Sequence, residues 1–180
     1  MSIAEHRFNN SLRRRPEDDD RQRRLTPNYV LAPIRKLFGG VIGLDPCTEA
    51  SNPVGAETFY CPPQDGCTLP WNSSTIFINP PYGLARIRWV TRAIAEAEGR
   101  RRQIVLLVPA HCETQICQRA LAACDSVCLI RARLRFQAVR ANGRREAASH
   151  GSALFGFNID LAPLAELGVI LRPDRSWRLL

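Results

Sequence analysis

The sequence has a single methionine, a single lysine and no long apolar run. No stretch approaches the roughly 18 consecutive apolar residues needed to cross a bilayer. The N-terminal segment, with Arg13 to Arg15 and an acidic run from Glu17 to Asp20, also lacks the apolar centre of a signal peptide. These absences exclude an integral membrane protein, and they predict a cytoplasmic protein without a membrane partner.

The seven cysteines form no C-x-x-C pair. Zinc sites usually contain such a pair, and a disulfide framework in a small secreted protein needs an even number of cysteines. Cys117 and Cys124 are seven residues apart and share a predicted helical face, which is typical of buried thiols. The cysteines therefore predict neither a structural metal nor a disulfide framework.

Arginine supplies all but one of the 25 basic residues, and the net charge is +8. An excess of positive charge favours an anionic partner, of which nucleic acid is the commonest. A second interpretation stays open, because a chain rich in arginine, alanine and proline can also reflect codon composition. Charge alone therefore does not decide between the two.

The apolar pattern predicts one α/β domain over residues 25–180, preceded by a flexible charged arm over residues 1–24. Runs that are apolar on both alternating faces are typical of parallel strands covered on both sides. Such runs lie at residues 41–44, 75–78, 104–108 and 127–130. Between the second and third, an amphipathic helix has Ile87, Val90, Ile94 and Ala97 on one side and Arg88, Arg92 and Glu96 on the outer side, and Gly99 ends it.

Other elements are predicted before and after this unit. We expect a helix with Thr26 as N-cap and Pro27 at its first position, ended by Gly39-Gly40. Another helix is expected at residues 111–124. The remaining predictions are strands at residues 134–139 and 153–157 joined by a long exposed loop, then a short helix and a last strand at residues 169–171.

The most informative residues are Asn79-Pro80-Pro81-Tyr82, directly after the predicted strand at residues 75–78. Ligands of open α/β sheets bind beyond the carboxyl ends of strands. The lone pair of an exocyclic amine is delocalised into its base, so two fixed hydrogen-bond acceptors would help the nitrogen towards tetrahedral geometry. The Asn79 side-chain oxygen and the Pro80 carbonyl suit this role, and Tyr82 would stack on the base. A proline-rich turn with a packed tyrosine is the alternative.

In their order along the chain, several segments resemble the phage-type DNA N-6-adenine methyltransferases over about residues 25–157. The resemblance rests on Leu25-Thr26-Pro27, Leu44-Asp45-Pro46-Cys47, Phe59-Tyr60, Asp65-Gly66, Trp71, Ile78 to Gly83, Leu106 to Ala110, and Arg133 to Phe136. It implies a Rossmann-like class I methyltransferase fold, a mostly parallel sheet with helices on both faces. It also implies a bacterial or phage enzyme that transfers a methyl group from S-adenosylmethionine to the 6-amino group of adenine in double-stranded DNA.

Position by position, the resemblance places the first cofactor motif at Asp45, Pro46 and Cys47. It places an N-terminal cofactor contact at Thr26 and Pro27, and a possible additional one at Asp65. Asp45 would bind the ammonium group or the ribose of the donor, and a carboxylate that caps the next turn is the alternative. The sequence departs from the usual pattern here, because no G-x-G turn follows the first strand and Pro53 leaves no room for a full crossover helix.

The chain has no room for a separate target-recognition domain. Recognition of DNA is therefore expected from an arginine-rich loop with Arg140, Arg144 and Arg145, or from another subunit, whereas a solvated surface is the alternative for the loop. His111 is expected at the rim, because the methylated amine loses its proton to water without a base. Two rivals stay open: a methyltransferase of an RNA adenine or a protein glutamine amide, and a non-catalytic nucleic-acid-binding relative.

Overall fold

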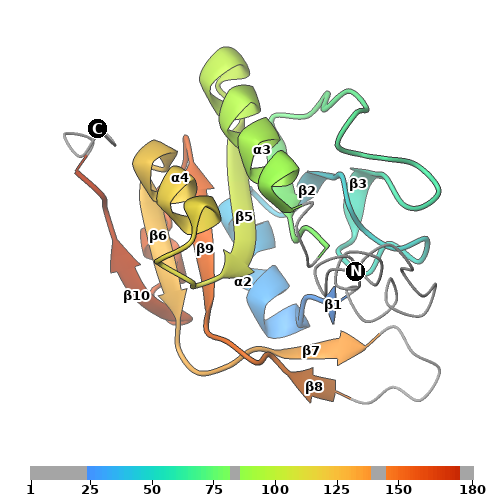
Figure 1. Cartoon of the computed structure of the whole chain (residues 1–180). Helices are drawn as coiled ribbons and strands as arrows, with labels where there is room; N and C mark the ends of the chain where they lie inside the picture. Colours follow the sequence, from blue (N-terminus) through green and yellow to red (C-terminus); the bar gives the residue numbers. More distant parts are fainter. Residues whose placement is uncertain (1–23, 82–85, 139–144, 175–180) are drawn as a thin grey trace, which may run out of the picture.

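The apolar runs of the sequence form the middle of a seven-stranded sheet with the order β10-β6-β9-β5-β4-β2-β3 (Figure 1). The computed structural model describes residues 24–81, 86–138 and 145–174. The strands of this sheet are β2 (Ile42–Asp45), β3 (Ala56–Phe59), β4 (Thr75–Ile78), β5 (Gln103–Pro109), β6 (Ser126–Ile130), β9 (Ser152–Phe157) and β10 (Gly168–Leu171).

Strands β2 to β6 of this sheet all run in one direction. β2 is parallel to β3 and β4, and β4 is parallel to β5. β9 is inserted antiparallel between β5 and β6, and β10 is antiparallel to β6. The predicted mostly parallel sheet is confirmed, with two antiparallel strands towards one edge.

Helices cover both faces of the sheet, as predicted. α2 (Asn28–Leu37) lies on one face together with the 3-10 helix η1 (Ala162–Leu164), and α3 (Arg86–Arg100) and α4 (Gln115–Ala123) lie on the other. Alternation along the strands explains this arrangement, because successive side chains point to opposite faces. Phe77 packs with the α2 layer, while its neighbours Ile76 and Ile78 pack with the α3 and α4 layer.

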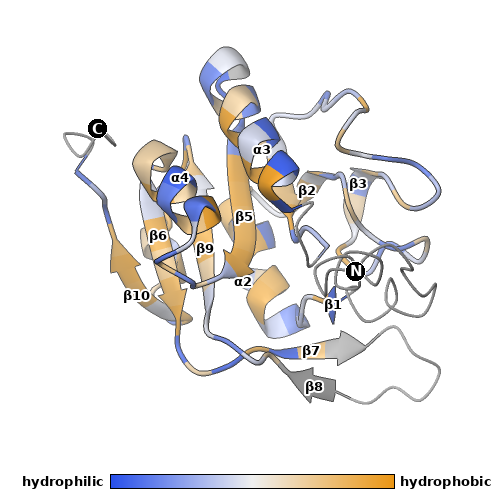
Figure 2. Cartoon of the chain, viewed as in Figure 1, coloured by the Kyte–Doolittle hydropathy of each residue, from blue (hydrophilic) through white to orange (hydrophobic). Residues whose placement is uncertain are grey.

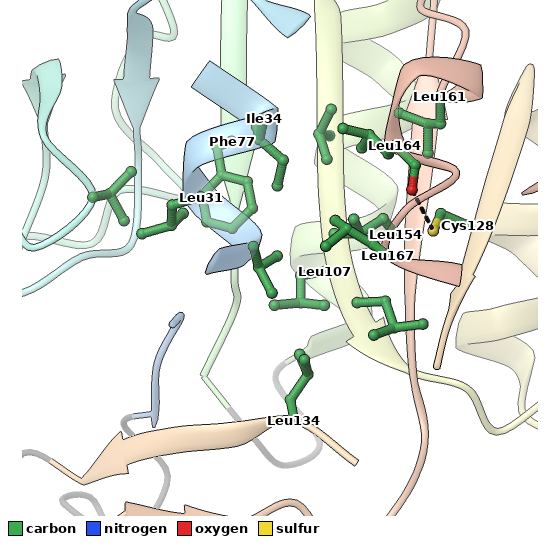
Figure 3. Packing of buried hydrophobic residues seen from close by; sticks show 14 of the residues in the cluster. Leu31, Ile34, Phe77, Leu107, Cys128, Leu134, Leu154, Leu161, Leu164 and Leu167 are labelled. Carbon is green, nitrogen blue, oxygen red and sulfur yellow. Dashed lines mark hydrogen bonds between the residues drawn. The ribbon is translucent and has the colours of Figure 1, made fainter. Parts of the chain in front are cut away.

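Apolar side chains fill the space between the layers. In Figure 2 the central strands are mostly hydrophobic, whereas α3 and α4 contain both hydrophilic and hydrophobic residues. Figure 3 shows the α2 side of the core, where Leu31 and Ile34 lie near Phe77. On the same side, the Cys128 thiol lies 3.9 Å from the Leu164 carbonyl oxygen. The predicted burial of Cys117 and Cys124 on the other face is confirmed.

The helix boundaries differ from the predictions by a few residues. α2 begins at Asn28 with Pro27 as its N-cap, and no side chain caps it, so the prediction of Thr26 as N-cap is wrong. α4 begins at Gln115 rather than 111, because the Thr114 hydroxyl accepts a hydrogen bond from the Cys117 N–H at 3.3 Å. α3 continues one residue beyond Gly99.

Glu96 is buried, which corrects its predicted place on the outer side of α3. Its side chain is only 7% exposed and forms ion pairs with Arg92 at 2.7 Å and with Arg102 at 3.4 Å. Arg92 also donates hydrogen bonds to the carbonyl oxygens of Cys67 and Leu69. The loop before β4 therefore covers this part of the helix, and a helical pattern cannot reveal such a cover.

A second, antiparallel sheet contains β1 (Arg24–Leu25), β7 (Arg135–Ala138) and β8 (Arg145–Ala147), in the order β1-β7-β8. Sequence analysis did not predict β1, β3 or β8, and β8 lies within the stretch predicted to be an exposed loop. Strands of two to four residues carry too little pattern to be recognised without their partners. Arg24 belongs to β1 rather than to the predicted arm.

Several predictions fall outside the described residues: the rest of the arm, Tyr82, Arg140 and Arg144. Arg145 belongs to β8, but its side chain is not described. Within the described part of the chain, no helix is long and apolar enough to span a membrane. The same part contains no group of three or more histidine, cysteine or acidic side chains that could hold a metal ion.

Candidate active site

The site lies where the strand order reverses. β2 pairs with β3 on one side and with β4 on the other, so the ends of β2 and β4 diverge into a crevice. A cavity of about 390 Å³ opens there. Its lining includes Thr26, Asp45, Pro46, Cys47, Asp65, Asn79, Pro80 and Pro81. The structure thus brings together the predicted donor and acceptor residues, except that Pro27 lines a neighbouring groove instead.

Asn79, directly after β4, is held by the segment that contains β1. Its side-chain nitrogen donates to the carbonyl oxygen of Arg24 at 2.7 Å and to the Thr26 hydroxyl at 3.0 Å. A carbonyl oxygen can only accept a hydrogen bond, so the nitrogen of the amide must face Arg24. Both N–H groups are then engaged, and no residue of the described ranges donates to the amide oxygen. Within that part of the chain, the amide oxygen therefore has no hydrogen-bond donor.

Asp45 ends β2 and is almost completely buried, with 2% exposure. Its Oδ1 atom accepts a hydrogen bond from the Cys47 N–H at 3.0 Å, which is the turn-capping contact given above as the alternative. Burial raises the pKa of the Asp45 carboxyl from 3.8 to about 7, against smaller opposing effects of hydrogen bonds from Cys47 and Thr48. Asp45 therefore shapes the turn at residues 45–47 and also lines the cavity.

Cys47 belongs to the predicted donor half and also contacts the backbone N–H of Asn79. Burial, and secondarily the neighbouring Asp45, raise the pKa of its thiol well above the usual value, although the Asn79 N–H has an opposing effect. The thiol is therefore neutral at physiological pH. It offers the cavity a small, weakly polar surface rather than a nucleophile.

A loop between β3 and β4 forms another wall of the cavity. Gly66 packs against the turn at residues 45–47 so closely that a Cβ atom would overlap the Pro46 carbonyl oxygen. The indole N–H of Trp71 donates to the Gly66 carbonyl at 2.8 Å, and Trp71 is fully buried. The tight contact explains a glycine at this position.

Asp65 stands at the mouth of the cavity. It pairs with Arg88 at 2.9 Å, and the two side chains are about half exposed. The hydrogen bond from Arg88 lowers the pKa of Asp65 below its ordinary value. Asp65 is therefore ionised, and its negative charge is partly balanced by Arg88, which also lines the cavity.

Sequence reasoning missed several residues that line the cavity, including Arg24, Glu49 and Arg88. Glu49 follows the turn at residues 45–47 closely, so its position after a strand end was an available signal. Arg88 was assigned only to the outer side of a helix, and Arg24 to the charged arm. Both reach the site through contacts between distant segments, which no local pattern reveals.

His111 lies beyond β5 and outside the residues that line the cavity. Its ring is 4.2 Å from that of His150, centroid to centroid, and its Nδ1 atom lies 3.4 Å from Glu113. Its place at the rim of the site stays a prediction. No histidine lines the cavity within the described part of the chain.

A comparison with known protein families shows which family the chain belongs to. A family model described as DNA N-6-adenine-methyltransferase (Dam) matches residues 14–175, which is most of the 180-residue chain. No curated protein matches the chain in a sequence search. The α/β fold and the Asn-Pro-Pro segment at a strand end agree with an amino-group methyltransferase. The chain therefore belongs to the DNA N-6-adenine-methyltransferase (Dam) family, whose enzymes methylate adenine in DNA.

Proposed function

We propose that the cavity binds S-adenosylmethionine beside an adenine that is flipped out of double-stranded DNA. The orientation of Asn79 is the observation that carries this proposal. Its amide nitrogen is committed to Arg24 and Thr26, which leaves the amide oxygen as an acceptor at the cavity. An acceptor fixed before the substrate arrives requires no reorganisation during the reaction.

The residues at the ends of β2 and β3 fit the methyl donor. A volume of about 390 Å³ lies within the usual range for small-molecule sites. The lining contains the ionised carboxylate of Asp65 and the carboxyl groups of Asp45 and Glu49. S-adenosylmethionine carries a sulfonium, an ammonium group and ribose hydroxyls, all of which suit carboxylate partners, and when bound it supplies an electrophilic methyl group.

Each half of the cavity then has a separate task. The turn at residues 45–47, together with Thr26 and Asp65, would hold the donor, and Pro27 would support Thr26 from the start of α2. The Asn79 side-chain oxygen and the Pro80 carbonyl would accept the two N–H bonds of the adenine amine and localise its lone pair. Pro81 restricts the backbone there. Tyr82, outside the described residues, would stack on the flipped base.

The same acceptors would also stabilise the positive charge that the nitrogen gains as it bonds to the methyl carbon. A proton must then leave the methylated amine. Such an ammonium is acidic and can release its proton to water, so a dedicated base is not required. The position of His111 outside the cavity supports this view.

The acceptor is tested by offering the protein labelled S-adenosylmethionine together with duplex DNA, RNA or protein. We expect label in adenine of the DNA only. Label only in RNA or in protein glutamine would contradict the proposal. Methylation-aware sequencing of DNA from cells that express the protein would identify the modified base and its context together.

A further inference from the structure

We propose that a groove beside the cavity binds the DNA strand that flanks the target adenine, through Tyr29, Arg133 and Arg135. This inference rests on the proposed function and extends it to the part of DNA outside the cavity. The loop with Arg140, Arg144 and Arg145 is not required for it.

The groove has a volume of about 480 Å³ and adjoins the cavity. Leu25, Thr26 and Pro53 line both spaces. The Thr26 hydroxyl also lies 3.0 Å from the Asn79 side-chain nitrogen. A nucleic acid strand in the groove would therefore lie next to the residues that bind the amine.

The walls of the groove offer positive charge. Arg133 and Arg135 are exposed, whereas Leu134 and Phe136 between and after them are buried. This alternation places both arginines on the outer side of the segment that leads into β7. Among the described residues, no acidic side chain forms an ion pair with either one. Guanidinium groups are well suited to phosphate oxygens.

Tyr29 supplies an aromatic surface at the same groove. It lies in the first turn of α2 and is 56% exposed, and no other described aromatic side chain is classed as exposed. Bases stack on exposed aromatic rings regardless of sequence. A flipped nucleotide also leaves a gap in the base stack, which an aromatic side chain beside the cavity could fill.

The experiment measures the affinity for a fluorescent DNA duplex of mixed sequence over a series of salt concentrations. The variant Arg133→Ala/Arg135→Ala removes two phosphate contacts, so we expect the slope of log affinity against log salt to fall by about 1.8. We expect an affinity loss of roughly tenfold at low salt. Tyr29→Ala should weaken binding roughly fivefold or more, while Tyr29→Phe should bind nearly as the wild type does.

A matched control is Arg101→Ala/Arg119→Ala. Both residues are exposed, and neither lines the groove or the cavity. This pair removes the same charge and should leave the salt slope nearly unchanged. Equal losses in both double variants would mean that only net charge matters, and this would overturn the inference. So would wild-type affinity and slope in Arg133→Ala/Arg135→Ala, or tighter binding of duplex RNA than of duplex DNA.

Calorimetry with S-adenosylmethionine checks that each groove variant keeps a folded cavity. Methyl transfer by the wild type is measured separately. If the wild type methylates DNA but the groove variants bind DNA normally, only the groove assignment fails. If the wild type transfers no methyl group, the proposed function fails, and the binding data still decide whether the groove holds DNA.

Discussion

The side-chain nitrogen of Asn79 donates a hydrogen bond to the Thr26 hydroxyl at 3.0 Å, across 53 residues of sequence. A second bond from the same nitrogen reaches the Arg24 carbonyl, and Arg24 is part of β1, which pairs with β7. The orientation of the amide therefore depends on the segment before α2. Thr26 accepts from Asn79 and so keeps its own hydroxyl hydrogen, which in the proposed function would be donated to the methyl donor.

The first prediction concerns Thr26. Thr26→Val keeps the size of the side chain but removes the acceptor, so the amide of Asn79 loses one of its two anchors. A neutral hydrogen bond of this kind is worth about 0.5–1.5 kcal/mol, so kcat for DNA methylation should fall roughly 2- to 13-fold. Thr26→Ser should restore most of the rate. Steady-state kinetics would contradict the role of Thr26 if the valine variant kept the wild-type kcat, or if the serine variant were equally slow.

The second prediction separates the two halves of the cavity. Asn79→Ala should lower methylation of DNA by about 10²- to 10³-fold, as for other fixed groups that stabilise developing charge. Calorimetry should detect nearly unchanged binding of S-adenosylmethionine. Asp45→Ala should instead weaken cofactor binding first, because it removes the carboxylate that shapes the turn at residues 45–47. Wild-type activity in both variants would refute the assignment.

The elements that sequence analysis predicted well are those whose pattern is local. Strands β4 and β5 are runs apolar on both faces, and α3 has a long helical repeat, so each was found within two residues of its bounds. The residues that were misjudged depend on distant partners. Thr26 was expected to cap its own helix but contacts Asn79, and Glu96 was expected in solvent but lies under a loop.

The third prediction concerns the pH dependence of stability. The unfolded chain loses the Asp45 proton near the ordinary pKa of 3.8, whereas the folded protein holds it until about pH 7. Between these values the folded state binds more protons, so raising the pH destabilises it. Asp45→Asn removes this effect and keeps an oxygen for the Cys47 N–H. Relative to the wild type, the free energy of unfolding of the variant should rise by up to roughly 4 kcal/mol between pH 4 and pH 8. The folded and unfolded pKa values differ by about 3 (7 minus 3.8), and a pKa difference of one corresponds to about 1.4 kcal/mol.

Chemical denaturation at several pH values measures this difference. Asp160→Asn serves as the control with the opposite sign, because Arg172 lowers the pKa of Asp160 and the ionised form favours folding. That variant should lose stability relative to the wild type as the pH rises up to the ordinary value of 3.8, and the difference should stay constant at higher pH. If the stability difference between the wild type and Asp45→Asn is the same at pH 4.5 and pH 8, the raised pKa of the buried Asp45 is ruled out.

The last prediction tests the contact between the loop before β4 and the turn at residues 45–47. In Gly66→Ala the new methyl group would overlap the Pro46 carbonyl oxygen, and a backbone atom cannot move aside as a flexible side chain can. The loop must shift, which moves Asp65 and widens the cavity, so the affinity for S-adenosylmethionine should fall.

Gly99→Ala is the matched control, because nothing lies within 4 Å of its added Cβ and it sits in α3. It should raise stability by about 0.4–1 kcal/mol through the unfolded state and leave cofactor affinity unchanged. Calorimetry and thermal unfolding of both variants decide the matter, and equal cofactor affinities would show that the loop does not form the wall of the donor site.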